Sequence, residues 1–144
     1  MVDAVRLRAL VSRLRGRIAD LGSYALLRPD EYLGNDQAIH ASKYLLVTAI
    51  EDALAIANHV IASEGLRAPA DYADAFRSLK DADLLAAGLS DRLEAMARFR
   101  NLLVHVYADV DNRRVHAFLN EDLGDLEKFA ASILDSFPEL KREV

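Results

Sequence analysis

Residues 97–107 read Ala-Arg-Phe-Arg-Asn-Leu-Leu-Val-His-Val-Tyr, a helical pattern with Arg100 at a position where leucine is expected. Steps of three and four residues from Leu93 define one stripe of this helix. The stripe consists of Leu93, Met96, Arg100, Leu103 and Tyr107. Because a buried guanidinium is costly unless an anion or hydrogen-bond acceptors meet it, we expect function at this helix.

Helical periodicity extends from this stretch in both directions. It predicts helices over about residues 3–27, 35–63, 71–85, 91–107 and 113–137, of which the third is short. Ser90 is a suitable N-cap for the helix that contains Arg100, with Glu94 near the capping-box position. The helix over 35–63 carries two apolar stripes, so we expect it at the centre, and we expect residues after Pro138 to fray.

These features predict the fold class. Alternation of the kind found in strands is nowhere sustained, and the chain of 144 residues has the length of one domain. The sequence therefore predicts an all-α, up-and-down bundle of four long helices plus one short helix, formed as a single domain over residues 1–144.

Composition excludes several kinds of site. The chain has no cysteine, and its four histidines show no pairing with carboxylates at coordinating spacing, so we expect neither a metal site nor another cofactor. No apolar run reaches the roughly 20 residues of a membrane span, and arginines interrupt the N-terminal segment. We expect a soluble cytoplasmic protein that does not enter the membrane.

Charge is distributed unevenly along the chain. Residues 1–28 hold six arginines and two aspartates, a net charge of +4, so the remainder carries −9 of the total of −5. Two interpretations stay open for this basic segment. It is either a surface for an RNA backbone or an acidic partner, or the ordinary solvated face of a helix.

The motif region resembles a known family. Residues 100–107 match the Arg-x4-His-x-Tyr pattern of the HEPN superfamily, and residues 96–107 are similar to the fourth-helix segment of its HepT-like ribonuclease toxins. The string Ala-Asn-His-Val-Ile-Ala at 57–62 also looks like theirs. The resemblance implies a single HEPN-like helical domain that acts as a metal-independent endoribonuclease. It also implies a homodimer in which two motif helices line a shared cleft.

The same resemblance implies a partner. Toxins of the MNT/HEPN toxin–antitoxin systems are paired with a minimal nucleotidyltransferase antitoxin. That antitoxin neutralises the toxin by transferring AMP onto the motif tyrosine, which is Tyr107 in this sequence.

The motif side chains suit metal-free cleavage of RNA. His105 is suited to proton transfer because an imidazole titrates near neutral pH. Arg100 is suited to holding the scissile phosphate through its planar fork of donors. Asn101 would orient the substrate or hold His105, and Tyr107 would bond the phosphate or stack on a base. Since the ribose 2′-hydroxyl is the available nucleophile, we expect products with a 2′,3′-cyclic phosphate.

Helix geometry raises a difficulty for this set. At about 100° per residue, His105 points about 140° away from Arg100, so one straight helix cannot aim both at one atom. Either the helix loosens near His105, or two subunits combine their faces across a two-fold axis. We favour the second arrangement, which makes the homodimer part of the mechanism.

The sequence leaves open which residues would support Arg100. Glu51 or Asp52 would pair with Arg100, or both are solvated acids; the family's acid, three residues before Asn58, is Ala55 here. His59 would line the cleft or lie on an ordinary helix surface.

His40 and His116 are expected at the surface. A different class of function also stays open: a non-catalytic helical dimer that binds a nucleotidyltransferase or a nucleotide through the same groove. Such a module would use Arg100 to hold a phosphate and would have no need of His105.

Overall fold

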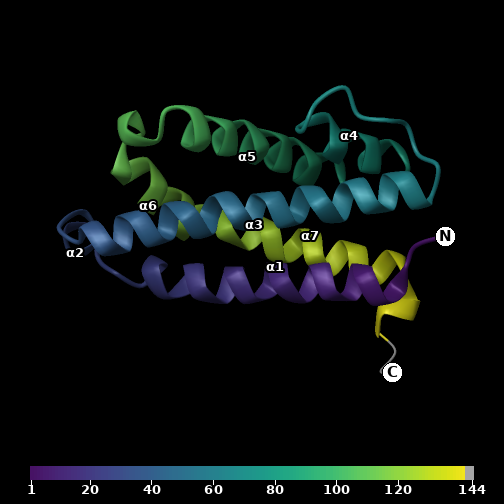
Figure 1. Cartoon of the computed structure of the whole chain (residues 1–144), viewed down its shortest axis with the longest axis horizontal. Coiled ribbons are helices and arrows are strands. Elements are labelled where there is room, and N and C mark those ends of the chain that lie inside the picture. The colour runs from purple at the N-terminus through teal and green to yellow at the C-terminus, as the bar shows by residue number, and fades with distance from the viewer. Residues whose placement is uncertain (142–144) are drawn as a thin grey trace.

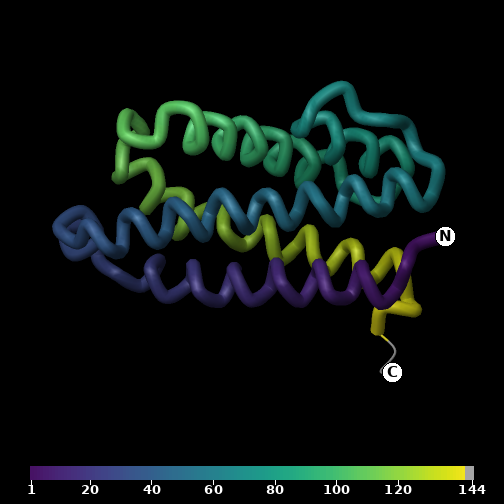
Figure 2. Tube along the Cα trace, in the orientation of Figure 1, coloured from purple at the N-terminus to yellow at the C-terminus, as the bar shows by residue number. Residues whose placement is uncertain are grey.

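The computed structural model describes residues 1–141 as helices joined by short loops (Figure 1). In chain order the elements are α1 (Ala4–Ala25), α2 (Pro29–Leu33), α3 (Asp36–Ser63), α4 (Asp74–Asp81), α5 (Ala87–His105), η1 (Tyr107–Asp109), α6 (Asn112–Glu121), α7 (Leu123–Ser136) and η2 (Pro138–Lys141). The long helices alternate in direction along the chain, as the tube in Figure 2 shows. No strand occurs among residues 1–141, so the predicted all-α bundle is confirmed.

The centre of the bundle is α3, as its two apolar stripes predict. It contacts α1 on one side and α4 and α5 on the other (Figure 1). By length and composition alone α3 is apolar enough to cross a membrane, with a mean hydropathy of 1.5 over 18 residues. However, 56% of that window is buried inside the bundle, which is typical of a core helix.

Both ends of α3 follow the local sequence. The Asn35 side chain caps the first turn by accepting a hydrogen bond from the backbone N–H of Ala38 at 3.0 Å. At the other end Gly65 has a φ of +63°, and the N–H of Leu66 donates to the carbonyl of Ile61 at 2.9 Å. This left-handed turn favours glycine, and α3 ends at Ser63, as the predicted range 35–63 has it.

The start of α5 differs from the prediction. The helix begins at Ala87, so Ser90 is not its N-cap; its hydroxyl is buried and has no hydrogen-bond partner among the described residues. Glu94 pairs with Arg77 at 2.9 Å instead of completing a capping box. Leu85 and Leu89 continue the buried stripe of Leu93 upstream, so apolar burial moves the helix start ahead of Ser90.

The helix predicted over 113–137 is divided into two helices in the structure. The chain bends at Asp122, where α6 ends and α7 begins, because the Asp-Leu-Gly sequence at 122–124 has low helix propensity at its first and last positions. In this way α6 reaches α2 while α7 packs on α1, α3 and α5.

Three further boundaries differ. The predicted connector after α1 contains the five-residue helix α2, with Pro29 at its favoured first position and Tyr32 fully buried. The short helix α4 covers 74–81 rather than 71–85. Residues 138–141 form a 3₁₀ helix with Leu140 buried, rather than fraying; the rest of the predicted frayed end, 142–144, lies outside the described residues.

Candidate functional site

Arg100 lies on α5 and faces α3, with 16% of its side chain exposed. Its Nη2 donates to Oε1 of Glu51 at 2.6 Å, and its Nη1 donates to Oδ1 of Asn101 at 3.0 Å. Its Nε is buried and has no partner among residues 1–141. The carboxylate that a largely buried guanidinium requires is therefore Glu51, one of the two candidates on α3.

An aromatic ring completes the surroundings of this guanidinium. Cζ of Arg100 lies 5.4 Å from the ring centroid of Tyr72, which belongs to the loop before α4. A cation over a ring face is attracted by the negative quadrupole of the ring. The guanidinium is thus oriented by groups from three segments: α3, α5 and the loop that carries Tyr72.

Asp52, the other candidate partner of Arg100, serves the fold instead. Its side chain is 8% exposed and points toward α1, where it accepts from Nε of Arg17 at 2.5 Å. Arg13 lies 4.0 Å away from the same carboxylate. Asp52 therefore ties α3 to α1, on the side of α3 opposite to Arg100.

His105 is the last residue of α5 and is exposed. The backbone leaves the helix at Val106, where φ is −130° and ψ is 41°. The helix therefore ends directly after His105 without changing the angle between His105 and Arg100. Within one subunit the two side chains stay on different faces of α5, and their meeting across a homodimer stays a prediction.

Tyr107 lies beyond the end of α5, so the helical stripe predicted from Leu93 stops before it. Its hydroxyl is hydrogen-bonded to Nδ1 of His40 at 2.9 Å, and the two rings are stacked, with centroids 6.0 Å apart and planes at 8°. Lys43 donates from Nζ to the Tyr107 carbonyl at 3.0 Å and lies 4.6 Å from the ring centroid. Burial raises the pKa of Tyr107 and lowers the pKa of Lys43.

Sequence reasoning missed the role of His40. It is exposed, as expected, but it contacts a motif residue 67 positions away in the chain. The sequence shows only that His40 and Lys43, three residues apart, share a helix face; nothing in it points to Tyr107.

The two other histidines have structural roles. Nε2 of His59 accepts a hydrogen bond from the backbone N–H of Asp3 at 3.2 Å, so His59 holds the start of α1, which favours its interpretation as an ordinary helix-surface residue. The surface prediction for His116 is wrong. It is 8% exposed, donates from Nε2 to the carbonyl of Leu27 at 2.8 Å, and meets the ring of Tyr32 edge-on. A neighbouring carbonyl and ring satisfy this imidazole inside the bundle.

Most arginines of the basic N-terminal segment are also engaged within the molecule. The pairs are Arg8 with the carbonyl groups of Glu139 and Leu140, Arg13 and Arg17 with Asp52, Arg15 with Glu127, and Arg28 with Glu31. Five of the six arginines thus have a partner in the fold, which favours the interpretation of an ordinary helix face.

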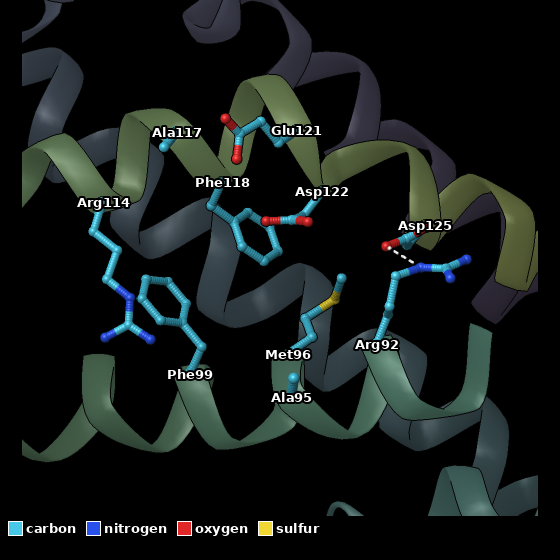
Figure 3. Close-up of a pocket in the computed structure, with 10 residues that line it drawn as sticks. All are labelled: Arg92, Ala95, Met96, Phe99, Arg114, Ala117, Phe118, Glu121, Asp122 and Asp125. Atoms are coloured by element: carbon cyan, nitrogen blue, oxygen red, sulfur yellow. Dashed lines mark hydrogen bonds and ion pairs between the residues drawn. The ribbon is translucent and has the colours of Figure 1, made fainter. Parts of the chain in front are cut away.

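A separate cavity of about 260 Å³ lies between α5, α6 and the start of α7 (Figure 3). Phe99 and Phe118 stack at its apolar side, and Arg114 lies 4.7 Å from the ring of Phe99. At the other side, Arg92 pairs with Asp125 at 3.1 Å. None of the four motif residues lines this cavity, so it is distinct from the Arg100 site.

The family model described as "Ribonuclease HepT-like" matches residues 14–133. The chain belongs to the HepT-like family. A stretch of 79 residues aligns at 33% identity with the mRNA nuclease HepT of Shewanella oneidensis. That match covers 55% of this HepT-like chain and 59% of the relative's length.

Solved structures show the same fold. The tri-AMPylated HEPN toxin of Shewanella oneidensis, in complex with MNT antitoxin, matches with a TM-score of 0.77 and 25% identity, over 94% of this HepT-like chain and 99% of that one. YutE of Bacillus subtilis, a cytosolic protein of unknown function, matches with a TM-score of 0.85 and 19% identity, over 99% of this HepT-like chain and 96% of that one.

Among residues 1–141 no group of three histidine or carboxylate side chains is arranged to hold a metal ion.

Proposed function

We propose that this chain is a metal-independent endoribonuclease toxin in which Arg100 holds the scissile phosphate and His105 transfers protons. The observation that carries the proposal is the guanidinium of Arg100, which is largely buried yet held by Glu51, Asn101 and Tyr72 rather than by the core. A preorganised donor of this kind stabilises charge that develops on a phosphoryl group. The name of the mRNA nuclease HepT from Shewanella oneidensis supports the choice of RNA.

The proposed reaction is an internal displacement at phosphorus. The ribose 2′-oxygen attacks, the bond to the 5′-oxygen breaks, and the products carry a 2′,3′-cyclic phosphate and a 5′-hydroxyl. The exposed His105 exchanges protons with these oxygens, while Arg100 stabilises the charge on the phosphorane. Asn101 and Tyr107 position the substrate.

The proposed active form is a homodimer. Leu102 and Val106, four residues apart within the motif, share one helix face and are 42% and 40% exposed, although they are large and apolar. A second copy of the chain would bury this surface. It would also bring His105 of one subunit toward Arg100 of the other, which one subunit alone does not achieve.

The proposed partner is an MNT-type nucleotidyltransferase antitoxin that adds AMP to Tyr107. The HEPN toxin of Shewanella oneidensis is AMPylated and bound to MNT antitoxin, which supports this pairing. Tyr107 is 37% exposed and can be reached. An added phosphodiester would place negative charge and bulk beside the motif and would repel RNA.

The test is cleavage of labelled single-stranded RNA by the purified chain in EDTA. We expect cleavage that persists in the chelator and yields cyclic-phosphate ends. His105→Ala should abolish it without altering the far-ultraviolet circular dichroism, because His105 is exposed and ends its helix. Arg98→Ala, a change at an exposed arginine on the same helix, is the matched control and should cleave normally.

Two results would reject the proposal. Products with only 3′-hydroxyl ends would exclude the mechanism. If Arg100→Ala abolished nucleotide or antitoxin binding while His105→Ala changed nothing, the chain would instead be the non-catalytic binding module.

A further inference from the structure

The contact between His40 and Tyr107 has no part in the proposed cleavage step. We propose that His40 is the proton acceptor that activates the Tyr107 hydroxyl as a nucleophile, so that the activated group for nucleotidylation is preformed within this chain. This inference rests on the proposed modification of Tyr107. It adds a catalytic residue for that modification, on a helix remote in sequence from the motif.

Geometry carries the inference. A nucleophile and its base must lie within hydrogen-bond reach, and the Tyr107 hydroxyl is 2.9 Å from Nδ1 of His40. The stacking of the two rings fixes their relative orientation, and the bond from Lys43 to the Tyr107 carbonyl holds the backbone of η1 against α3. Two contacts therefore join the phenol to the imidazole, and a third holds the Tyr107 backbone against the helix that carries His40.

The chemistry of a phenol explains why a base is needed. Free tyrosine has a pKa of about 10, so it is neutral and weakly nucleophilic near pH 7. Burial raises the pKa of Tyr107 further, which makes an unaided phenolate rarer still. An imidazole accepts a proton in this range, since its ordinary pKa is about 6.5.

The other tyrosines lack this arrangement. Among residues 1–141, Tyr107 is the one tyrosine whose hydroxyl is hydrogen-bonded to a histidine. Tyr44 and Tyr72 are more exposed, at 65% and 55%, and Tyr32 is buried with its hydroxyl bonded to Ser42. Exposure alone would direct a reagent to Tyr44, whereas a base directs it to Tyr107.

The transfer step balances with a nucleoside triphosphate as co-reactant, presented by the transferase. The Tyr107 Oη attacks the α-phosphorus and forms an O–P bond. The bond from that phosphorus to the bridging oxygen breaks, and pyrophosphate leaves. The hydroxyl proton moves to Nδ1 of His40, which requires the tautomer with its other proton on Nε2. The resulting imidazolium lies beside the new phosphodiester anion, which it stabilises.

The experiment uses benzenesulfonyl fluoride, which forms an S–O bond with an activated phenol and releases fluoride. Peptide mass spectrometry follows the rate of labelling at each tyrosine of the whole chain. In the wild type we expect Tyr107 to react faster than Tyr44 and Tyr72, despite its smaller exposure. His40→Gln retains a hydrogen-bonding group but cannot take the proton, so labelling of Tyr107 should fall by at least about tenfold.

Two controls separate activation from folding. In His40→Gly, free imidazole added to the solution should restore labelling of Tyr107, which a purely structural role would not allow. His59→Gln changes another histidine of α3, far from the Tyr107 contact, and should leave the Tyr107 rate unchanged. The labelling rate of Tyr44 serves as the internal reference in every variant.

Several outcomes would overturn the inference. These are a Tyr107 no more reactive than Tyr44, an unchanged rate in His40→Gln, or no rescue by imidazole. The assay contains neither RNA nor the transferase, so a chain that failed to cleave RNA would still pass it. A chain that cleaves RNA but fails the labelling assay would lose this inference alone.

Discussion

At the scale of single residues, Arg100 owes its position to three partners that each use a different property of the guanidinium. Glu51 pairs with its positive charge, Asn101 accepts one directed hydrogen bond, and the ring of Tyr72 interacts with its flat face. A lysine could satisfy the first of these, but its ammonium has neither the planar fork nor the face. The site is therefore specific for arginine rather than for positive charge.

This specificity gives a prediction for Arg100→Lys. We expect RNA cleavage to fall by about 100-fold or more, because the oriented donors are lost although the charge remains. The melting temperature should hardly change, since the pair with Glu51 is partly exposed and such pairs contribute about 1 kcal/mol or less. Cleavage rates and thermal melts measure both effects. Arg98→Lys is the control, and equal losses in the two variants would contradict the prediction.

A second prediction compares two buried serines. The Ser90 hydroxyl has no partner among the described residues, so Ser90→Ala should leave stability unchanged or raise it by up to about 1 kcal/mol. Ser42 is bonded to the Tyr32 hydroxyl at 2.7 Å and to the Ile39 carbonyl, so Ser42→Ala should cost about 1–2 kcal/mol. Urea unfolding of both variants measures the difference. A larger loss in Ser90→Ala would show that the hydroxyl is bonded after all.

The sequence contained the Arg100 anomaly but only part of its surroundings. A charge on a hydrophobic stripe is visible from spacing alone, and Glu51 was one of two candidate partners. The pairing of His40 with Tyr107 could not be predicted, because it joins the first turns of α3 to a backbone that leaves α5 at Val106. Local periodicity carries no information about where such an exit directs the next side chain.

At the scale of elements, periodicity predicted that the helices form but did not predict where each one begins and ends. Ser90 has the local preference of an N-cap, but the leucines upstream add buried area that outweighs a cap, which contributes about 1 kcal/mol. At the bend at Asp122, by contrast, local helix propensity outweighs the apolar pattern. There the apolar spacing continues across 119–126, and low local propensity divides one predicted helix into α6 and α7.

The junction of α1 with α3 gives a third prediction. Arg17→Ala removes the main partner of a carboxylate that is 8% exposed, so it should destabilise the fold by about 1–3 kcal/mol. Arg15→Ala breaks a pair in which both side chains are over 40% exposed, and it should change stability by about 0.5 kcal/mol or less. Chemical denaturation distinguishes the two, and equal effects would contradict the role of Asp52.

The loop that carries Tyr72 gives a prediction of pH dependence. Arg67 hydrogen-bonds to Asp74 and, with the backbone N–H of Ala70, lowers the pKa of that carboxyl from 3.8 to about 2. We call these hydrogen bonds from Arg67 and Ala70 to the Asp74 carboxylate the Asp74 clip. Because the folded-state pKa of Asp74 is depressed, the clip is present above pH 4 and is lost as the pH falls toward 2.

Hydrogen exchange at the Ala70 amide measures this clip. We expect its protection to decline across that acidic range in the wild type. In Asp74→Asn, protection should be low and independent of pH. Protection that survived unchanged at pH 2 would contradict the assignment of the clip to Asp74.

At the scale of the whole molecule, the angle between Arg100 and His105 would make the proposed site a property of two chains, if both groups act on one phosphate. This gives a complementation prediction. Arg100→Ala and His105→Ala should each be inactive alone. If each site takes its arginine from one subunit and its histidine from the other, a mixed dimer regains one intact site of two.

Mixing equal amounts under conditions of subunit exchange should therefore restore roughly a quarter of the wild-type rate, since about half of the dimers are mixed. Cleavage assays before and after exchange measure the gain. No gain, with exchange verified by mass spectrometry of differently labelled subunits, would mean that each site draws both groups from one chain.

The internal pairing of the arginines in residues 1–28 also bears on how RNA would approach the molecule. Each phosphate that a protein neutralises on a single strand releases condensed counterions and steepens the dependence of affinity on ionic strength, by a slope of about −0.7. Five of the six N-terminal arginines already have partners in the fold, and the chain as a whole is acidic. The N-terminal segment therefore offers few unpaired cations to attract a polyanion from a distance. If the proposed cleavage of RNA is correct, we expect capture of RNA to depend on short-range fit at the motif and to vary only weakly with added salt.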